Sequence, residues 1–167
     1  MLDAGARPAT PLAASLDDTR YEIELNYLSI ISMTEGFAPV LAANDGGAFV
    51  NMLSVVSWFA APNLATYSAS KAAAWSYSNT SRVELKRQGT EVLGVHVGFV
   101  DTDLTASFEG DKVQAHEVAT AAFDGLEAGG PEVAVDQWSR DVKAGLSDDH
   151  RLIYPEVEAQ FNAAVAS

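Results

Sequence analysis

The sequence predicts an α/β fold in which helices flank a parallel sheet. Two short apolar runs, residues 47–53 and 92–97, have the length and composition of buried strands. Segments long enough for helices lie before, between and after them, so strands and helices alternate. Connections of this length favour parallel pairing, because a parallel crossover needs a dozen or more residues. With 167 residues and 48% hydrophobic content, the chain can bury one core, and we expect a single domain over 1–167.

The N-terminal part is expected to be a loop followed by a long helix. Residues 1–19 contain two prolines and read as loop, and Ser15 followed by acidic residues marks a helix start. The helix should extend over about 18–43. Pro39 falls inside it and predicts a kink or a late break, because proline lacks the backbone N–H that a helix interior uses.

The central part is expected to be a strand, a loop and a second long helix. The strand at 47–53 follows a glycine pair and runs into a loop that begins at Ser54. The helix should cover about 64–88, with Gly89 as its C-cap. The remaining elements are, in order, a strand at 92–97, a helix at 115–128, a short strand at 132–136 and a helical tail.

Tyr67 and Lys71 lie four residues apart on the second long helix. Positions i and i+4 share a helix face, so the phenol and the ammonium address the same small volume. A phenol has a pKa of about 10, and a cation beside it lowers that pKa, which would suit proton exchange with a carbonyl or an alcohol. The alternative is a surface lysine lying along an amphipathic tyrosine. Ser54 favours the first interpretation, because ligands bind at the carboxyl ends of strands in open α/β sheets.

Composition excludes several classes of function. The net charge of −13 argues against nucleic acid and anionic membrane surfaces as partners. No run of about 18 apolar residues and no secretory signal is visible, and cysteine is absent, so we expect a cytoplasmic protein. His96, His116 and His150 lack the spacing of metal ligands, and we interpret them as structural, with no metal site.

Several motifs together resemble the short-chain dehydrogenase/reductase family. Ser54, Tyr67 and Lys71 keep the order and spacing of its Ser–Tyr–Lys triad, and Asn26 matches the asparagine that completes its tetrad. Asp3-Ala4-Gly5 is similar to the end of the family's Asn-Asn-Ala-Gly motif, with Asp3 in place of an asparagine. A second segment is similar to the family's Pro-Gly-x-x-x-Thr motif, with Val97 in place of the proline: Val97-Gly98-Phe99-Val100-Asp101-Thr102. The matches run from residue 3 to 104.

The resemblance implies the C-terminal part of a doubly wound Rossmann-like parallel sheet and hydride transfer between NAD or NADP and a carbonyl or alcohol substrate. It implies that Ser54 holds the substrate oxygen, that Tyr67 exchanges the proton with it, and that Lys71 lowers the pKa of Tyr67 and binds the nicotinamide ribose. Asn26 would hold a water that relays protons to Lys71. Cofactor contacts would come from Tyr67, Lys71, Val100 and Thr102. In the family, the helices that correspond to 18–43 and 64–88 form a homo-oligomer contact.

The Gly-rich cofactor turn of this family has no counterpart here, because both glycine pairs precede strands. We therefore expect a partial Rossmann-like domain without its first strands, which alone binds NAD or NADP weakly or not at all. Two alternatives stay open, a catalytically silent truncated remnant and a helix-mediated interaction module. The substrate, the choice between NAD and NADP, and dimer versus tetramer are also open. Trp58 and Phe59 either line a substrate pocket or cover an edge of the core.

Overall fold

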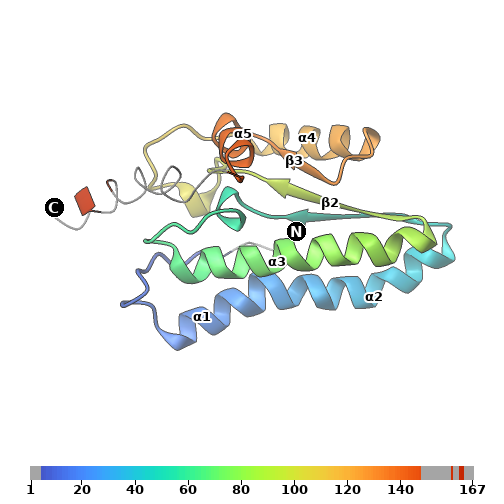
Figure 1. The fold of residues 1–167 in the computed structure, drawn as a ribbon, viewed down its shortest axis with the longest axis horizontal. Helices are drawn as coiled ribbons and strands as arrows, with labels where there is room; N and C mark the ends of the chain where they lie inside the picture. Colours follow the sequence, from blue (N-terminus) through green and yellow to red (C-terminus); the bar gives the residue numbers. More distant parts are fainter. Residues whose placement is uncertain (1–4, 148–158, 160–161, 164–167) are drawn as a thin grey trace.

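The computed structural model describes residues 5–147, 159, 162 and 163 and has a three-stranded parallel sheet at its centre (Figure 1). Strands β1 (Gly47–Met52), β2 (Thr90–His96) and β3 (Glu132–Ala134) lie side by side in the order β1-β2-β3. The register pairs Gly47 with Thr90 and Val95 with Val133. The predicted α/β class and parallel pairing are confirmed. Asp3 lies outside the described residues, as does most of the expected helical tail.

Helices cover both faces of the sheet, as in a doubly wound fold. On one side lie α1 (Leu16–Ile23), α2 (Ser29–Ala43) and α3 (Ala65–Leu85), and on the other lie α4 (Ala115–Glu127) and α5 (Gln137–Ala144) (Figure 1). Among the helices, α3 packs most extensively against the sheet, on the central strand β2. In the part of the chain that the structure describes, no helix is long and apolar enough to cross a membrane.

The first long helix is continuous through Pro39 and irregular elsewhere. Its start is capped by Ser15, whose hydroxyl accepts a hydrogen bond from the Asp18 amide at 3.0 Å. A π-helical turn over Glu24–Leu28 joins α1 to α2. Of the predicted kink or late break, a break at Pro39 itself does not occur, because α2 continues to Ala43. The carbonyl that Pro39 leaves without a partner belongs to Glu35, which is exposed, and water can bind it.

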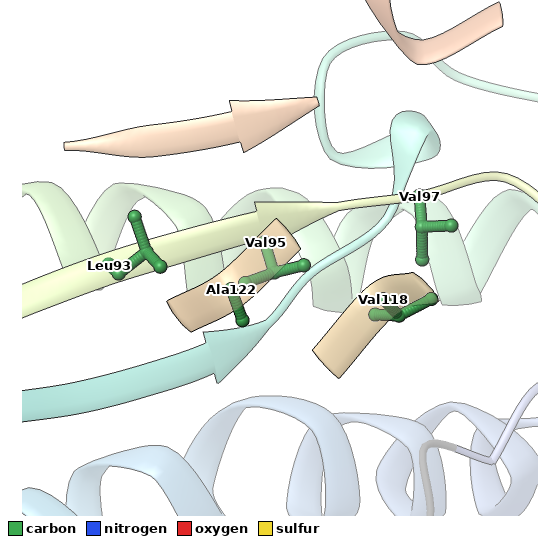
Figure 2. Packing of buried hydrophobic residues seen from close by; sticks show 5 residues of the cluster. All are labelled: Leu93, Val95, Val97, Val118 and Ala122. Carbon is green, nitrogen blue, oxygen red and sulfur yellow. The ribbon is translucent and has the colours of Figure 1, made fainter. Parts of the chain in front are cut away.

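The core lies between α4 and the aliphatic side chains of β2 and of Val97, the residue that follows it. Leu93, Val95 and Val97 pack against Val118 and Ala122, and all five are at most 9% exposed (Figure 2). The middle of β2, Val92–Val95, is an uninterrupted apolar run, as a strand buried on both faces requires. This packing fixes the C-terminal end of β2, next to which the candidate site lies.

The starts of β1 and of the central strand β2 meet at a tight contact between glycines. Gly46 has φ +115 and Gly89 has φ +73, conformations that favour glycine. A Cβ on Gly46 would lie 2.3 Å from the Gly89 carbonyl oxygen. Gly89 also ends the helical run of α3 and its final 3-10 turn, Lys86–Gln88, as the sequence predicted.

One edge of the sheet and one helix face are open in this structure. β1 pairs only with β2 among the described residues, and Val50 on β1 is 41% exposed. Along α2, Met33, Phe37 and Val40 are between 44% and 51% exposed. Exposed apolar side chains gathered on one helix indicate a surface that another element or molecule covers.

Candidate active site

Ser54 stands just beyond the C-terminal end of β1, where the sequence placed it. It is buried and caps a short 3-10 turn, Val55–Ser57, in which its amide donates to the Ser57 hydroxyl at 3.1 Å. The amide of Val55 donates to the Val97 carbonyl at 3.0 Å, which ties this turn to the chain beyond β2. The backbone of Ser54 is therefore held from both sides.

Tyr67 lies in the first turn of α3, and its phenol lies near enough to the Ser54 side chain for the Ser54 hydroxyl to lower the phenol pKa. Burial raises the pKa of Tyr67 to about 12, the Ser54 hydroxyl opposes this, and the charge of Glu22 adds to the rise. Tyr67 is consequently protonated at neutral pH. The two hydroxyls predicted to handle a substrate oxygen are in contact with each other.

Lys71 is fully enclosed one turn further along α3. Its ammonium donates to the Met52 carbonyl at 2.9 Å and lies 5.7 Å from the centroid of the Tyr67 ring. Burial lowers the pKa of Lys71 to about 8. Lys71 is not among the groups that shift the pKa of Tyr67 here, because desolvation dominates both groups and the ammonium is directed at the backbone of β1. The expectation that Lys71 lowers the pKa of Tyr67 stays a prediction.

Asn26 lies in the π-helical turn and is 3% exposed. Its side-chain amide donates to the Gly5 carbonyl at 3.0 Å and to the Ser70 hydroxyl at 3.1 Å. Ser70 directly precedes Lys71, so Asn26 connects the N-terminal segment to the helix that carries Tyr67 and Lys71. It is neither a surface residue nor a helix cap. Its carbonyl oxygen is buried without a hydrogen-bond partner among the described residues.

Val100 and Thr102 follow β2 at the same edge of the sheet. Val100 is half-buried and bridges to Val113, while Thr102 is exposed and precedes the 3-10 turn Asp103–Thr105. The Thr102 hydroxyl donates to the Val100 carbonyl at 3.4 Å, and its amide donates to the Thr105 hydroxyl at 3.3 Å. Hydrogen bonds of Thr102 thus stay within its own loop.

Sequence reasoning missed three buried polar residues next to the site. His96 and Glu22 are each 0% exposed, and Glu132 is 12% exposed at its side chain. One oxygen of Glu22 accepts from the Arg7 amide at 2.6 Å and the other has no partner among the described residues. The one available signal for Glu22 was its spacing of four from Asn26 on a helix. His96 and Glu132 carry no sequence pattern that joins them.

The two aromatic residues after Ser54 have different surroundings. Trp58 stacks on the His96 ring with centroids 3.6 Å apart, so it covers a buried polar group. Phe59 packs edge-on against Trp138 at 5.7 Å, and Trp138 is 43% exposed. Within the described ranges, no group of three or more acidic, histidine or cysteine side chains is arranged to hold a metal ion.

The comparison with known families decides the assignment. The family model for short chain dehydrogenases matches residues 3–112, which include Asn26, Ser54, Tyr67, Lys71 and Thr102. The chain belongs to the short-chain dehydrogenase family.

Similar proteins in this family are reductases and dehydrogenases. A 3-oxoacyl-[acyl-carrier-protein] reductase of Synechocystis is 28% identical over 102 residues, 61% of this chain and 41% of that protein. An NADPH-dependent 1-acyldihydroxyacetone phosphate reductase of Schizosaccharomyces pombe is 32% identical over 114 residues, 68% of this chain and 38% of that protein. The chain thus spans about two fifths of the length of these curated relatives.

Solved structures of short-chain dehydrogenases confirm the Rossmann-like fold. A short-chain dehydrogenase from Burkholderia cenocepacia J2315, in complex with NADP, superposes with a TM-score of 0.87 at 31% identity, covering 93% of this chain and 65% of that one. A short-chain dehydrogenase/reductase from Burkholderia phymatum, in complex with NAD, gives a TM-score of 0.76 at 19% identity, covering 95% of this chain and 65% of that one. Such proteins carry NAD or NADP.

The described residues fit only the nicotinamide end of such a cofactor site. A buried ammonium and a buried phenol, on Lys71 and Tyr67, lie at the carboxyl edge of the sheet, where this family needs polar groups for the cofactor and the substrate. Gly46 and Gly47 lie at the opposite edge and precede a strand, so they cannot form the Gly-rich turn that holds a pyrophosphate at a helix N-terminus.

Proposed function

We propose that this chain carries the catalytic half of an NAD(P)-dependent oxidoreductase that interconverts a carbonyl and an alcohol. The observation that supports this most directly is the contact between the Ser54 and Tyr67 hydroxyls beside the buried Lys71. Two hydroxyls that share one point at a sheet edge can hold one substrate oxygen between them. The family membership supports the proposed reaction class, and the geometry supports the roles proposed for the residues.

In the proposed reaction, the bound NADPH or NADH supplies a hydride to the carbonyl carbon. Ser54 donates a hydrogen bond to the carbonyl oxygen and orients it. Tyr67 transfers its phenolic proton to the same oxygen as negative charge develops there, which completes the alcohol. With a pKa of about 12, Tyr67 holds this proton at neutral pH, which supports the reductive direction. Lys71 would bind the nicotinamide ribose together with Tyr67, and Val100 and Thr102 would contact the nicotinamide.

Asn26 has a positioning role in this proposal. Its amide holds Ser70, the residue before Lys71, and the Gly5 carbonyl, so it fixes the first turns of α3 relative to the N-terminal segment. Its free carbonyl oxygen can accept a hydrogen bond from a water, as the expected relay to Lys71 requires.

A tyrosine substitution tests the proposal. In the protein joined to its complete cofactor-binding half, Tyr67→Phe should lower kcat/KM for carbonyl reduction by about 10²–10⁴-fold, because general acid catalysis is lost. Tyr77→Phe is the matched control, since Tyr77 lies on the same helix and packs against the Tyr27 ring at 6.2 Å, away from Ser54. Near-normal turnover by the Tyr67 variant would overturn the assignment.

We also propose that the protein forms a homo-oligomer through α1, α2 and α3. The support is the exposed apolar row on α2, Met33, Phe37 and Val40, together with Val83 on α3, which is 76% exposed. Val83 lines a hollow with Asn79, Thr80, Glu84 and Arg87. Trp75 does not face this surface, because its indole donates to Glu132 on the sheet side. A strictly monomeric species in light scattering at tens of micromolar would contradict this proposal.

A further inference from the structure

His96 ends β2 directly behind Ser54 and is fully buried. Its ring nitrogen Nδ1 lies 3.2 Å from the Ser54 carbonyl oxygen. A carbonyl only accepts hydrogen bonds, so Nδ1 carries the hydrogen and donates it, and in the neutral ring Nε2 is then unprotonated. The imidazole therefore holds the backbone of the residue whose hydroxyl contacts Tyr67.

The other side of the imidazole faces Glu132 of β3. Nε2 lies 3.8 Å from Oε1 of Glu132, and that same oxygen accepts a hydrogen bond from the Trp75 indole. The second oxygen, Oε2, accepts from the Lys143 ammonium of α5 at 2.8 Å. Trp75 lies on α3 two turns after Tyr67. With Nε2 unprotonated, neither that nitrogen nor the carboxylate has a hydrogen to donate, so Glu132 lies beside the buried ring without a hydrogen bond to it. Glu132 is instead bonded to α3 through Trp75 and to α5 through Lys143.

The face of the imidazole is also fixed. Trp58 stacks on it with centroids 3.6 Å apart and an interplanar angle of 13°, and the Lys143 ammonium lies 5.4 Å from the centroid of the Trp58 ring. Burial lowers the pKa of His96 to about 4; the Ser54 carbonyl and Glu132 oppose this, and Lys143 and Arg82 add to it. The ring is neutral at physiological pH, so its bond to Ser54 does not depend on pH there.

We propose that His96 is a positioning residue for Ser54: its Nδ1 hydrogen bond fixes the Ser54 backbone and thereby keeps the Ser54 hydroxyl in register with Tyr67. This assignment rests on the proposed function, in which those two hydroxyls hold one substrate oxygen. Three segments meet at the imidazole: β2, which carries it, the loop after β1 and β3. A shift of about 1 Å between Ser54 and Tyr67 would cost about 10²-fold in rate.

The tautomer of His96 is the first test, and it needs no catalytic activity. In protein labelled with ¹⁵N-histidine, long-range nitrogen–proton spectra should show His96 protonated on Nδ1 alone at neutral pH and unchanged down to about pH 5. The variant His96→Asn assigns the signal. Protonation on Nε2 instead would overturn the proposal, because the bond to the Ser54 carbonyl would then be impossible.

The second test measures the contact that His96 is proposed to set. The ¹³Cζ resonance of Tyr67 reports what its hydroxyl is bonded to, and Ser54→Ala gives the value for the broken contact. His96→Leu should move the resonance to that value. His96→Asn, whose amide can still donate to the Ser54 carbonyl, should keep it near wild type. The control His116→Leu changes an exposed histidine of α4 and should move nothing.

A folded His96→Leu protein with the wild-type Tyr67 resonance would overturn the proposal, and so would an Asn variant that matches Ser54→Ala. If the His96→Leu variant does not fold, the His96→Asn resonance and the tautomer of His96 still test the proposal. In the complete protein, His96→Leu should lower kcat by about 10–100-fold with KM little changed, and His96→Asn should restore most of it. Absence of all turnover in wild type would refute the proposed function and leave both spectroscopic results standing.

Discussion

At the scale of single residues, burial sets the protonation of the site more than neighbouring charge does. Tyr67 and Lys71 are both enclosed, and desolvation is the largest cause of each pKa shift, upward for the phenol and downward for the ammonium. The spacing of Tyr67 and Lys71 can be read from the sequence, but their burial cannot, because it results from packing between distant segments. The direction of the Tyr67 shift could therefore not be predicted from residues 67–71.

Lys71 should make the stability of the protein depend on pH. Its pKa is about 8 when folded against 10.5 in the unfolded chain, so between these values the unfolded state binds the extra proton and stability rises with pH. Below about pH 8 the buried ammonium costs stability. The free energy of unfolding by urea should thus increase from pH 7.5 to 9.5 in wild type.

The substitution Lys71→Met should remove that increase and raise stability at neutral pH, because an apolar side chain of similar length replaces a buried charge. Lys86→Met, which changes an exposed lysine beyond the same helix, is the control and should leave the increase intact. The same slope in the Lys71→Met variant and in wild type would contradict the assignment of the pH dependence to Lys71.

The residues of the site differ in how far the sequence could identify them. The spacing of Tyr67 and Lys71 on a helix and the place of Ser54 after a strand follow from local periodicity, and the structure confirms both placements. Asn26 needed the family resemblance. His96 and Glu132 are joined only by the pairing of β2 with β3, which no local pattern contains. Their contact was therefore beyond sequence reasoning.

At the scale of elements, strands and helices could be predicted where burial is uniform. Local departures from ideal helix geometry could not. The apolar runs and the Gly89 cap located β1, β2 and α3 to within a few residues. The π-helical turn Glu24–Leu28 has no composition signal, and Pro39 suggested an irregularity that solvent exposure makes harmless. Helix continuity depends on which carbonyls can reach water.

Two glycine substitutions should have opposite effects on stability. Gly46→Ala places a Cβ 2.3 Å from the Gly89 carbonyl oxygen at φ +115, and should lower the free energy of unfolding by about 2–4 kcal/mol. Gly36→Ala is in the interior of α2 with no atom within 4 Å of the new Cβ, and should raise it by about 0.5–1 kcal/mol.

Both variants are measured by urea unfolding followed by circular dichroism. Their comparison separates the steric and backbone cost at the strand starts from the general effect of replacing glycine by alanine. Equal effects of the same sign would show that the contact between Gly46 and Gly89 does not constrain the sheet.

At the scale of the whole molecule, the described residues include the proposed catalytic groups of a dehydrogenase. They do not include a site for the pyrophosphate and adenosine of its cofactor. Hydride transfer needs the nicotinamide at about 3–3.5 Å from the substrate carbon, and remote binding energy fixes that distance. Here the pyrophosphate and the adenosine lack a binding turn among residues 5–147, and the net charge of −13 repels an anionic dinucleotide.

Residues 1–167 alone should therefore bind NAD and NADP weakly, with no micromolar Kd in calorimetry. Any residual binding should come from the nicotinamide end and disappear in Lys71→Met. A clear micromolar Kd for either dinucleotide in the isolated chain would contradict this expectation and show that the carboxyl edge of β1 and β2 suffices for binding.

The parallel register of the sheet has a consequence for how fast the chain can fold. Gly47 pairs with Thr90, and the whole of α3 lies between them, so no two strands of this sheet can zip together from a tight turn. Each pairing must first close a long loop, whose entropy is lost before strand contacts compensate for it. We expect refolding in milliseconds to seconds in stopped-flow measurements, with α3 structured before β1 and β2 meet.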